Sequence, residues 1–179
     1  MHKPSLLEIF EHPKTQKYLQ RSGVVHAIAS SYHSYKLSAQ YGVDPILACK
    51  AALLHDIGHY TWYRDGKWDY EQYKANDIHA IKGAERAHKL LVELGEDREN
   101  AKAISLAILL HTDSYLPGGQ LELNPLQKVV RLADEADEEP GGLHHYREIS
   151  YDKAVALINK LDSLLLKGKG LSSPLQQTS

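Results

Sequence analysis

Residues 53–59 read LLHDIGH, an apolar stretch that ends in an adjacent histidine and aspartate, a glycine and a second histidine. A charged aspartate at the end of a buried helix is costly unless it is paired or binds a metal ion. Adjacent helical residues point about 100° apart, so His55 and Asp56 can reach one ion only where the helix ends. Gly58 would loosen the backbone there. The other interpretation is a solvated helix C-terminus whose dipole favours the histidine.

Around this stretch, apolar residues recur every three or four positions and strand-like alternation is missing. The sequence therefore predicts an all-α fold of about six to eight helices with negligible sheet. A short N-terminal helical region should break at Pro13, and glycine and aspartate should mark several later boundaries. We expect helices over residues 23–41, 45–58, 77–94, 97–111, 125–138 and 151–167, with loops over residues 60–77 and 112–124.

The chain of 179 residues is expected to form one domain over residues 1–168, with a core at 23–138 and a disordered tail at 169–179. A formal net charge of -2 and the lack of a basic run argue against a nucleic-acid polymer as partner. No apolar run approaches the roughly 20 residues of a membrane span, and no signal-peptide core is present. We expect a cytoplasmic protein.

Eleven histidines and a single cysteine, Cys49, restrict the chemistry of any metal site. One cysteine permits neither a disulfide framework nor a thiolate zinc site, so the ligands must be nitrogen and oxygen atoms. A lone histidine on an apolar helix face is more often a hydrogen-bonded core residue than a ligand. Three further segments end an apolar stripe in a possible ligand, and together they point to a shared site: His26 and His33 share one face of the first, His111 ends the second and Asp134 ends the third.

The ordered segments resemble the HD-domain superfamily of metal-dependent phosphohydrolases over residues 23–138. The resemblance is carried by the pair His55 and Asp56 after AALL, an upstream histidine helix and the aspartate of LAD. It implies an HD-domain helical bundle in which His26, His55, Asp56 and Asp134 hold a first metal ion.

The first of these ligands has two candidates. A hinge between antiparallel helices at Gly42 slightly favours His33, because it would bring His33 nearer the level of His55. The family pattern favours His26, which precedes Gly42 by sixteen residues. We predict His26 as the ligand.

Members of the superfamily with two metal ions carry two more histidines between the HD pair and the last aspartate. HAIKGAERA supplies His79, with Gly83 one turn later, and LLHTD supplies His111. The resemblance therefore implies a binuclear centre bridged by Asp56. The expected cofactor is one or two divalent transition ions, of Fe, Mn, Zn, Ni or Co. His88 lies on another face of its helix and is expected at the surface.

The implied activity is hydrolysis of a phosphoester or phosphoanhydride of a small nucleotide-like substrate by a metal-bound hydroxide. Asp56 and His59 are the predicted catalytic residues, although many related hydrolases have lysine where His59 stands. The predicted substrate-binding residues are Trp62, Arg64, Lys67 and His33. QKVVRLADEADEEPGG somewhat resembles the bacterial symmetrical diadenosine tetraphosphate hydrolases, with an approximate match at residues 139–141.

Two other functions remain open. Some HD-fold proteins with the same six ligands hold a di-iron centre and cleave C–C or C–P bonds with oxygen. A non-catalytic nucleotide-binding regulatory module would keep the metal for structure. The apolar face of the last helix could serve the core or a homodimer.

Overall fold

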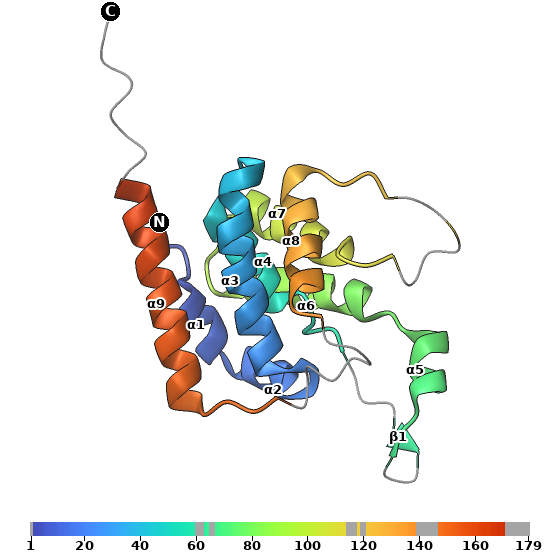
Figure 1. Ribbon diagram of the computed structural model, residues 1–179. Coiled ribbons are helices and arrows are strands. Elements are labelled where there is room, and N and C mark those ends of the chain that lie inside the picture. Colours follow the sequence, from blue (N-terminus) through green and yellow to red (C-terminus); the bar gives the residue numbers. More distant parts are fainter. Residues whose placement is uncertain are drawn as a thin grey trace, which may run out of the picture.

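The computed structural model describes residues 2–59, 63–64, 67–113, 118, 121–138 and 147–170, and only the backbone at 63, 64, 68, 169 and 170. Helices dominate this part of the chain, as the apolar periodicity predicts (Figure 1). The elements are α1 (Leu6–Glu11), α2 (Pro13–Ser22), α3 (Val24–Tyr41), α4 (Pro45–Leu54), β1 (Tyr63–Arg64), β2 (Lys67–Trp68), α5 (Tyr70–Asn76), α6 (His79–Glu93), α7 (Arg98–Leu109), α8 (Pro125–Ala136) and α9 (Tyr151–Gly170).

Helix α3 crosses the middle of the molecule and packs against α4, α8 and α9 (Figure 1). Helix α7 packs on α4, α6 and α8 and closes the other side of the core. Leu53, Leu54, Ile104, Ile108 and Val130 are at most 1% exposed, and each such side chain contributes roughly 1.5–3 kcal/mol by burial. The core therefore surrounds the end of α4, where the HD pair follows.

The start and end of α4 explain where the HD pair lies. The Asp44 side chain accepts the N–H of Ile46, and Pro45 occupies the first turn. The helix ends at Leu54, four residues before the expected end at Gly58, and residues 55–58 form tight turns. The backbone N–H of His55 bonds Ala52 O and that of Ile57 bonds Leu54 O, which narrows the last turn. This tightening brings both residues of the HD pair to one side.

The segment expected as a loop over residues 60–77 contains regular structure. Strands β1 and β2 pair antiparallel, with Tyr63 opposite Trp68 and Arg64 opposite Lys67. Helix α5 follows, and Asp69 caps it by accepting the N–H of Gln72. Helix α5 has no buried residue. A helix without a buried face needs no apolar stripe in its sequence, so the apolar periodicity did not predict α5.

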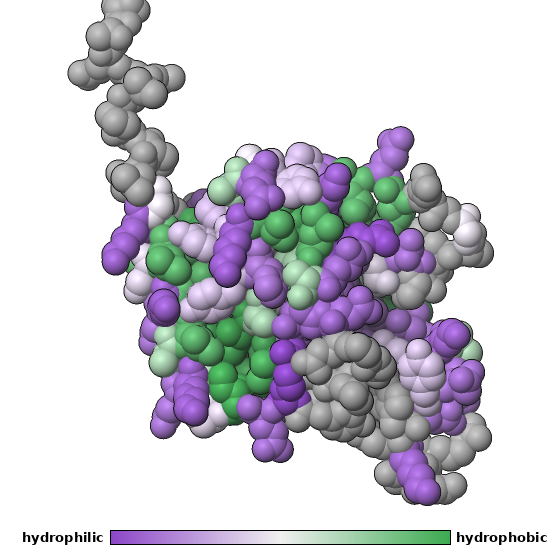
Figure 2. All heavy atoms as spheres, viewed as in Figure 1, coloured by the Kyte–Doolittle hydropathy of each residue, from purple (hydrophilic) through white to green (hydrophobic). Residues whose placement is uncertain are grey.

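The C-terminal helix α9 extends to Gly170, three residues beyond the expected end. The rest of the expected tail, residues 171–179, lies outside the described residues. In Figure 2, hydrophobic residues are visible between α9 and α3, whereas hydrophilic residues predominate over α8. Tyr151, Leu157 and Leu166 of α9 are exposed large hydrophobic residues. The expected homodimer stays a prediction. None of the described helices is long and apolar enough to cross a membrane.

Candidate metal centre

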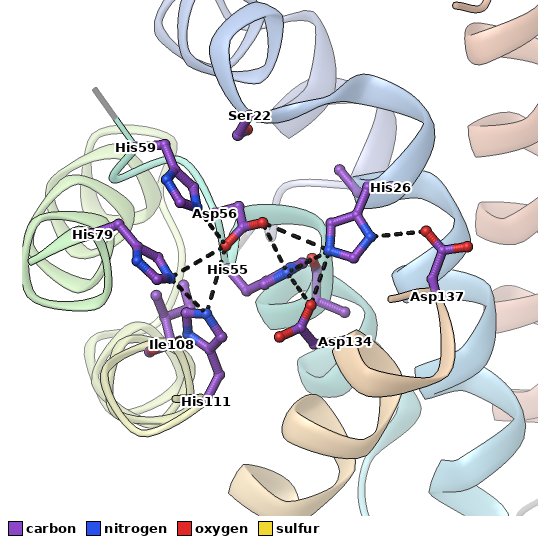
Figure 3. Close-up of polar contacts among 12 residues, drawn as sticks. Ser22, His26, His55, Asp56, His59, His79, Ile108, His111, Asp134 and Asp137 are labelled. Atoms are coloured by element: carbon purple, nitrogen blue, oxygen red, sulfur yellow. Dashed lines mark hydrogen bonds and ion pairs between the residues drawn. The ribbon is translucent and has the colours of Figure 1, made fainter. Parts of the chain in front are cut away.

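Six histidine and aspartate side chains from five separate segments converge beside the end of α4 (Figure 3). The contributing segments are α3, the turn at residues 55–58, the start of α6, the turn that follows α7, and α8. All but Asp134 are buried. The residues are His26, His55, Asp56, His79, His111 and Asp134. His55 is adjacent to Asp56 in the sequence, and the other four residues are 23 to 78 positions away from it, so only the fold brings them together.

The first group consists of His26, His55, Asp134 and one oxygen of Asp56. Nε2 of His26 lies 3.1 Å from Nε2 of His55, and Oδ1 of Asp134 lies 2.9 Å and 3.2 Å from these two nitrogens. Oδ2 of Asp56 is 3.6 Å from Nε2 of His26 and 3.4 Å from Nε2 of His55. One ligand atom from each residue lies within 4.8 Å of the other three, so a single ion could bind all four.

The second group surrounds the other oxygen of Asp56. Oδ1 lies 3.5 Å from Nε2 of His79 and 3.5 Å from Nε2 of His111, and these two nitrogens are 3.1 Å apart. Nε2 of His59 is 3.3 Å from the same oxygen, and its ring stacks on that of His79 with centroids 4.1 Å apart. Asp56 thus directs one oxygen toward each group, as a bridging carboxylate does.

Backbone carbonyls hold the outer nitrogens of two of these histidines. Nδ1 of His55 is 2.6 Å from Ala52 O, and Nδ1 of His111 is 2.6 Å from Ile108 O. A carbonyl oxygen can only accept, so Nδ1 must carry the proton in both rings. Nε2 of each neutral ring therefore presents a lone pair to the centre.

Carboxylates hold the outer nitrogens of the other two. Nδ1 of His26 donates to Oδ2 of Asp137 at 2.8 Å, and Nδ1 of His79 donates to Asp77 at 2.7 Å. Burial works against the ionised form of Asp77, but the hydrogen bond from His79 holds the pKa of Asp77 below its ordinary value. Burial also opposes ionisation of Asp137, whose pKa is lowered by hydrogen bonds from Arg147 and His26. Both aspartates are therefore acceptors at neutral pH.

The charge state of the centre suits a cation. Burial disfavours ionised Asp56 and Asp134, yet the neighbouring histidines hold the pKa of both carboxyls well below their usual range. Burial and the nearby His59 both lower the pKa of His79. The lowered pKa keeps His79 neutral. Burial opposes protonation of His55 as well, but Asp56 and Asp134 raise its pKa above the ordinary value. Without another cation, the two carboxylates draw a proton onto His55.

Residues 23–139 match the HD domain family, which is more than half of the chain. The chain belongs to the HD-domain family. It is 66% identical over 165 residues to "Putative phosphohydrolase YueE" of Bacillus subtilis (strain 168), an alignment that covers 92% of this chain and 94% of that protein. The resemblance inferred from the HD pair is thereby confirmed.

A solved structure shares the fold of this HD-domain protein. The crystal structure of a "predicted HD superfamily hydrolase" from an uncultured Thermotogales bacterium matches with a TM-score of 0.50 and 20% identity. The match covers 92% of this chain and 87% of that chain. The all-α HD fold is therefore confirmed.

Within the HD-domain fold, the two candidates for the first histidine are separated by geometry. Nε2 of His26 lies beside His55 and Asp134, as given above. His33 is seven residues further along α3, roughly 10 Å along the helix axis, and is not among the described residues that gather at the centre. The hinge argument that favoured His33 used helix length alone, whereas the described geometry places His26 beside His55 and Asp134. His33 is half-buried on α3, and its role in substrate binding stays a prediction.

The other predicted residues have mixed outcomes. His59 lies at the centre, where it was expected to be catalytic, and it also groups with Asp56 and His79 as a potential ligand. Lys67 is exposed on β2. Trp62 and the Arg64 side chain lie outside the described residues. His88 is exposed, in agreement with its prediction as a surface residue.

Sequence reasoning missed three residues that contact the predicted ligands or the predicted catalytic His59. Asp77 and Asp137 hold His79 and His26, and the hydroxyl of Tyr73 lies 3.4 Å from Nδ1 of His59. Two signals were available. Asp77 stands two residues before a candidate ligand at a helix start, and Asp137 stands three residues after Asp134, close to the same face of α8. Tyr73 left no comparable signal, because α5 itself was unexpected.

Proposed function

We propose that the protein is a metal-dependent phosphohydrolase that uses two divalent ions held on either side of Asp56. The six proposed ligands are His26, His55, Asp134 and Asp56 for one ion, and His79, His111 and Asp56 for the other. Membership of the HD-domain family and the 66% identity to a protein named as a phosphohydrolase support this activity. The proposed substrate is a phosphoester or phosphoanhydride of a small nucleotide-like molecule.

The facing nitrogens carry this proposal. Nε2 of His26 and Nε2 of His55 are 3.1 Å apart, and the hydrogen bonds at Nδ1 leave both Nε2 atoms as lone pairs when the rings are neutral. The same holds for His79 and His111, also 3.1 Å apart. Two lone pairs at this distance repel each other unless a proton, as on His55 in the metal-free protein, or a metal cation lies between them. Imidazole nitrogens with carboxylate oxygens are the donors that divalent transition ions accept.

Divalent ions at these positions would lower the pKa of a water molecule and neutralise negative charge on a phosphoryl group. The chain contributes the rest of the chemistry. Asp56 would contribute one oxygen to each of the two metal positions. His59 is the proposed proton donor to the leaving group, because its side chain is 19% exposed and its Nε2 lies 3.3 Å from Oδ1 of Asp56. Lys67 and Arg64 are proposed to bind distal phosphate from the hairpin.

A substrate screen with matched variants tests this function. Protein loaded separately with Mn²⁺, Co²⁺, Zn²⁺, Ni²⁺ or Fe²⁺ is assayed for phosphate or nucleotide release from a panel of nucleotides and phosphoesters. We expect turnover by the wild type, loss of at least ~100-fold in kcat/KM for His79→Ala, and unchanged turnover for His88→Ala in the same helix. Metal-loaded protein without activity on the panel contradicts the proposal. Oxygen consumption by the iron-loaded protein would favour an oxygenase instead.

A further inference from the structure

Two aspartates outside the proposed ligand set lie behind it, each against the outer nitrogen of one histidine. Nδ1 of His79 is 2.7 Å and 2.8 Å from the two oxygens of Asp77, and Nδ1 of His26 is 2.8 Å from Oδ2 of Asp137. The Asp77 and Asp137 side chains are only 9% and 12% exposed. These short, sheltered contacts hold the two rings on the side opposite Nε2, as Figure 3 shows for Asp137 and His26.

We propose that Asp77 and Asp137 are positioning residues, one for each metal position. Asp137 would act through His26 on the position that also contacts Asp134. Asp77 would act through His79 on the position shared with His111. This inference rests on the proposed metal-dependent function.

The physical reason lies in what a carboxylate does for a ligating imidazole. Its hydrogen bond fixes the proton on Nδ1, fixes the rotation of the ring and makes Nε2 a stronger donor to a metal ion. In His55 and His111, by contrast, Nδ1 donates its hydrogen bond to a neutral backbone carbonyl. Each metal position thus combines one histidine held by a carbonyl with one held by a carboxylate. Side-chain substitution can remove only the second kind of support.

The two aspartates differ in what else they hold. Asp137 also accepts two hydrogen bonds from Arg147, at 2.5 Å from Nη2 and 3.3 Å from Nη1. The guanidinium of Arg147 partly neutralises the negative charge of Asp137. Asp77 accepts the backbone N–H of His79 at 3.0 Å, so it also stabilises the start of α6. Asparagine at either position keeps an acceptor oxygen but removes the charge. Comparing alanine with asparagine therefore separates the hydrogen bond from the charge.

Cobalt binding tests the assignment without any assay of activity. Co²⁺ affinity at each position is measured by competition with a chelator, and the visible absorption of Co²⁺ reports its ligand geometry. We expect Asp77→Ala and Asp137→Ala each to weaken one of two Co²⁺ sites by about 10- to 100-fold and to leave the other unchanged. Asp77→Asn and Asp137→Asn should recover most of the affinity. Asp113→Ala is the matched control.

Asp113 is a suitable control because it is two residues from a proposed ligand, His111, as Asp77 is from His79. Its side chain is 46% exposed and lies 3.5 Å from Arg131. Asp113→Ala should therefore leave both Co²⁺ affinities at the wild-type value.

Double variants show which position each aspartate serves. Adding Asp77→Ala to His111→Ala should change Co²⁺ binding little, because that position is already disrupted. Adding it to His26→Ala should weaken the remaining site by the full factor. The converse holds for Asp137→Ala, which should be silent in His26→Ala and effective in His111→Ala.

The outcomes separate this inference from the function on which it rests. A wild type that binds no Co²⁺ overturns both. If the wild type binds two ions and the four variants of Asp77 and Asp137 bind them with the same affinities, the positioning role alone is overturned. An equal loss at both positions in Asp77→Ala, with no recovery in Asp77→Asn, also contradicts the assignment.

Discussion

Gly58 lies directly against the backbone of Gly83. A Cβ atom added at Gly58 would be 2.4 Å from the Gly83 nitrogen and 1.8 Å from the carbonyl oxygen of His79. A Cβ at Gly83 would in turn be 3.3 Å from the Gly58 nitrogen. The absence of side chains at both positions lets the turn that follows α4 seat against α6. This contact sets the separation between Asp56 and His79, and hence between the two halves of the centre.

Gly58→Ala should therefore be strongly destabilising. The new methyl group overlaps backbone atoms, which cannot rotate away, so we expect a loss of ~3 kcal/mol or more in the free energy of unfolding. Urea denaturation measures it. Gly168→Ala is the control, because a Cβ there meets nothing within 4 Å. The close packing would be contradicted if the two variants unfolded at the same urea concentration.

The ion pair between Lys50 and Glu96 offers a second test of the core. Both side chains are at most 3% exposed, and Glu96 also accepts the side-chain N–H of Asn100 at 3.2 Å. Glu96→Ala leaves a buried ammonium without its partner, for which the expected loss is roughly 3–5 kcal/mol in the free energy of unfolding.

The control for Glu96→Ala is Lys89→Ala, which removes the exposed pair with Glu85. Lys89→Ala should leave the free energy of unfolding unchanged, because solvent screens an exposed pair. Equal unfolding midpoints for both variants in urea would rule out a structural role for the buried pair.

Metal affinity should fall as the pH falls. Burial opposes the charged form of His55, but Asp56 and Asp134 outweigh it and raise the pKa of His55 in the metal-free protein. A bound ion needs the lone pair of Nε2, so binding must release that proton. Below the raised pKa, protons compete with the ion, and above it they do not.

Calorimetric titration with Zn²⁺ in buffers of different ionisation enthalpy counts the protons released. We expect release of about one proton near pH 6 and less at higher pH. Affinity that stays constant from about pH 5 to 8 would show that His55 is not a ligand.

The thiol of Cys49 should be inert in the folded protein. Burial raises its pKa to about 12, against an ordinary value of 9.0. The thiol therefore stays protonated and out of reach at pH 8, and an aromatic disulfide reagent should label it only after unfolding. Rapid stoichiometric labelling of native protein would contradict this burial. In the unfolded chain this thiol loses its proton at a lower pH than in the folded protein. The free energy of unfolding should therefore fall as the pH rises from about 9 toward 12.

Much of the fold was predictable, because the helices with apolar stripes carry their own signal. Asp44, Pro45 and Asp97 mark helix starts, and Gly42 adopts a left-handed φ of 63° at the end of α3. Helix α5 and the hairpin before it could not be predicted, because α5 has no buried residue.

The residues of the centre were predictable to different degrees. LLHDIGH and LAD point to His55, Asp56 and Asp134 through their place at the ends of apolar stripes. The choice between His26 and His33 needed the crossing of α3 and α4, which helix length alone does not give. Asp137 was not found although it stands three residues after Asp134, because the sequence does not show that it contacts His26, 111 residues away.

The central claim is that Asp56 lies between two metal ions. Anomalous diffraction from crystals loaded with Mn²⁺ tests it most directly, in the wild type and in Asp56→Asn. We expect two Mn²⁺ peaks in the wild type, one near Oδ2 with His26, His55 and Asp134 and one near Oδ1 with His79 and His111, and weaker peaks in Asp56→Asn. No Mn²⁺ in the wild type, or two fully occupied sites that survive in Asp56→Asn, would contradict it.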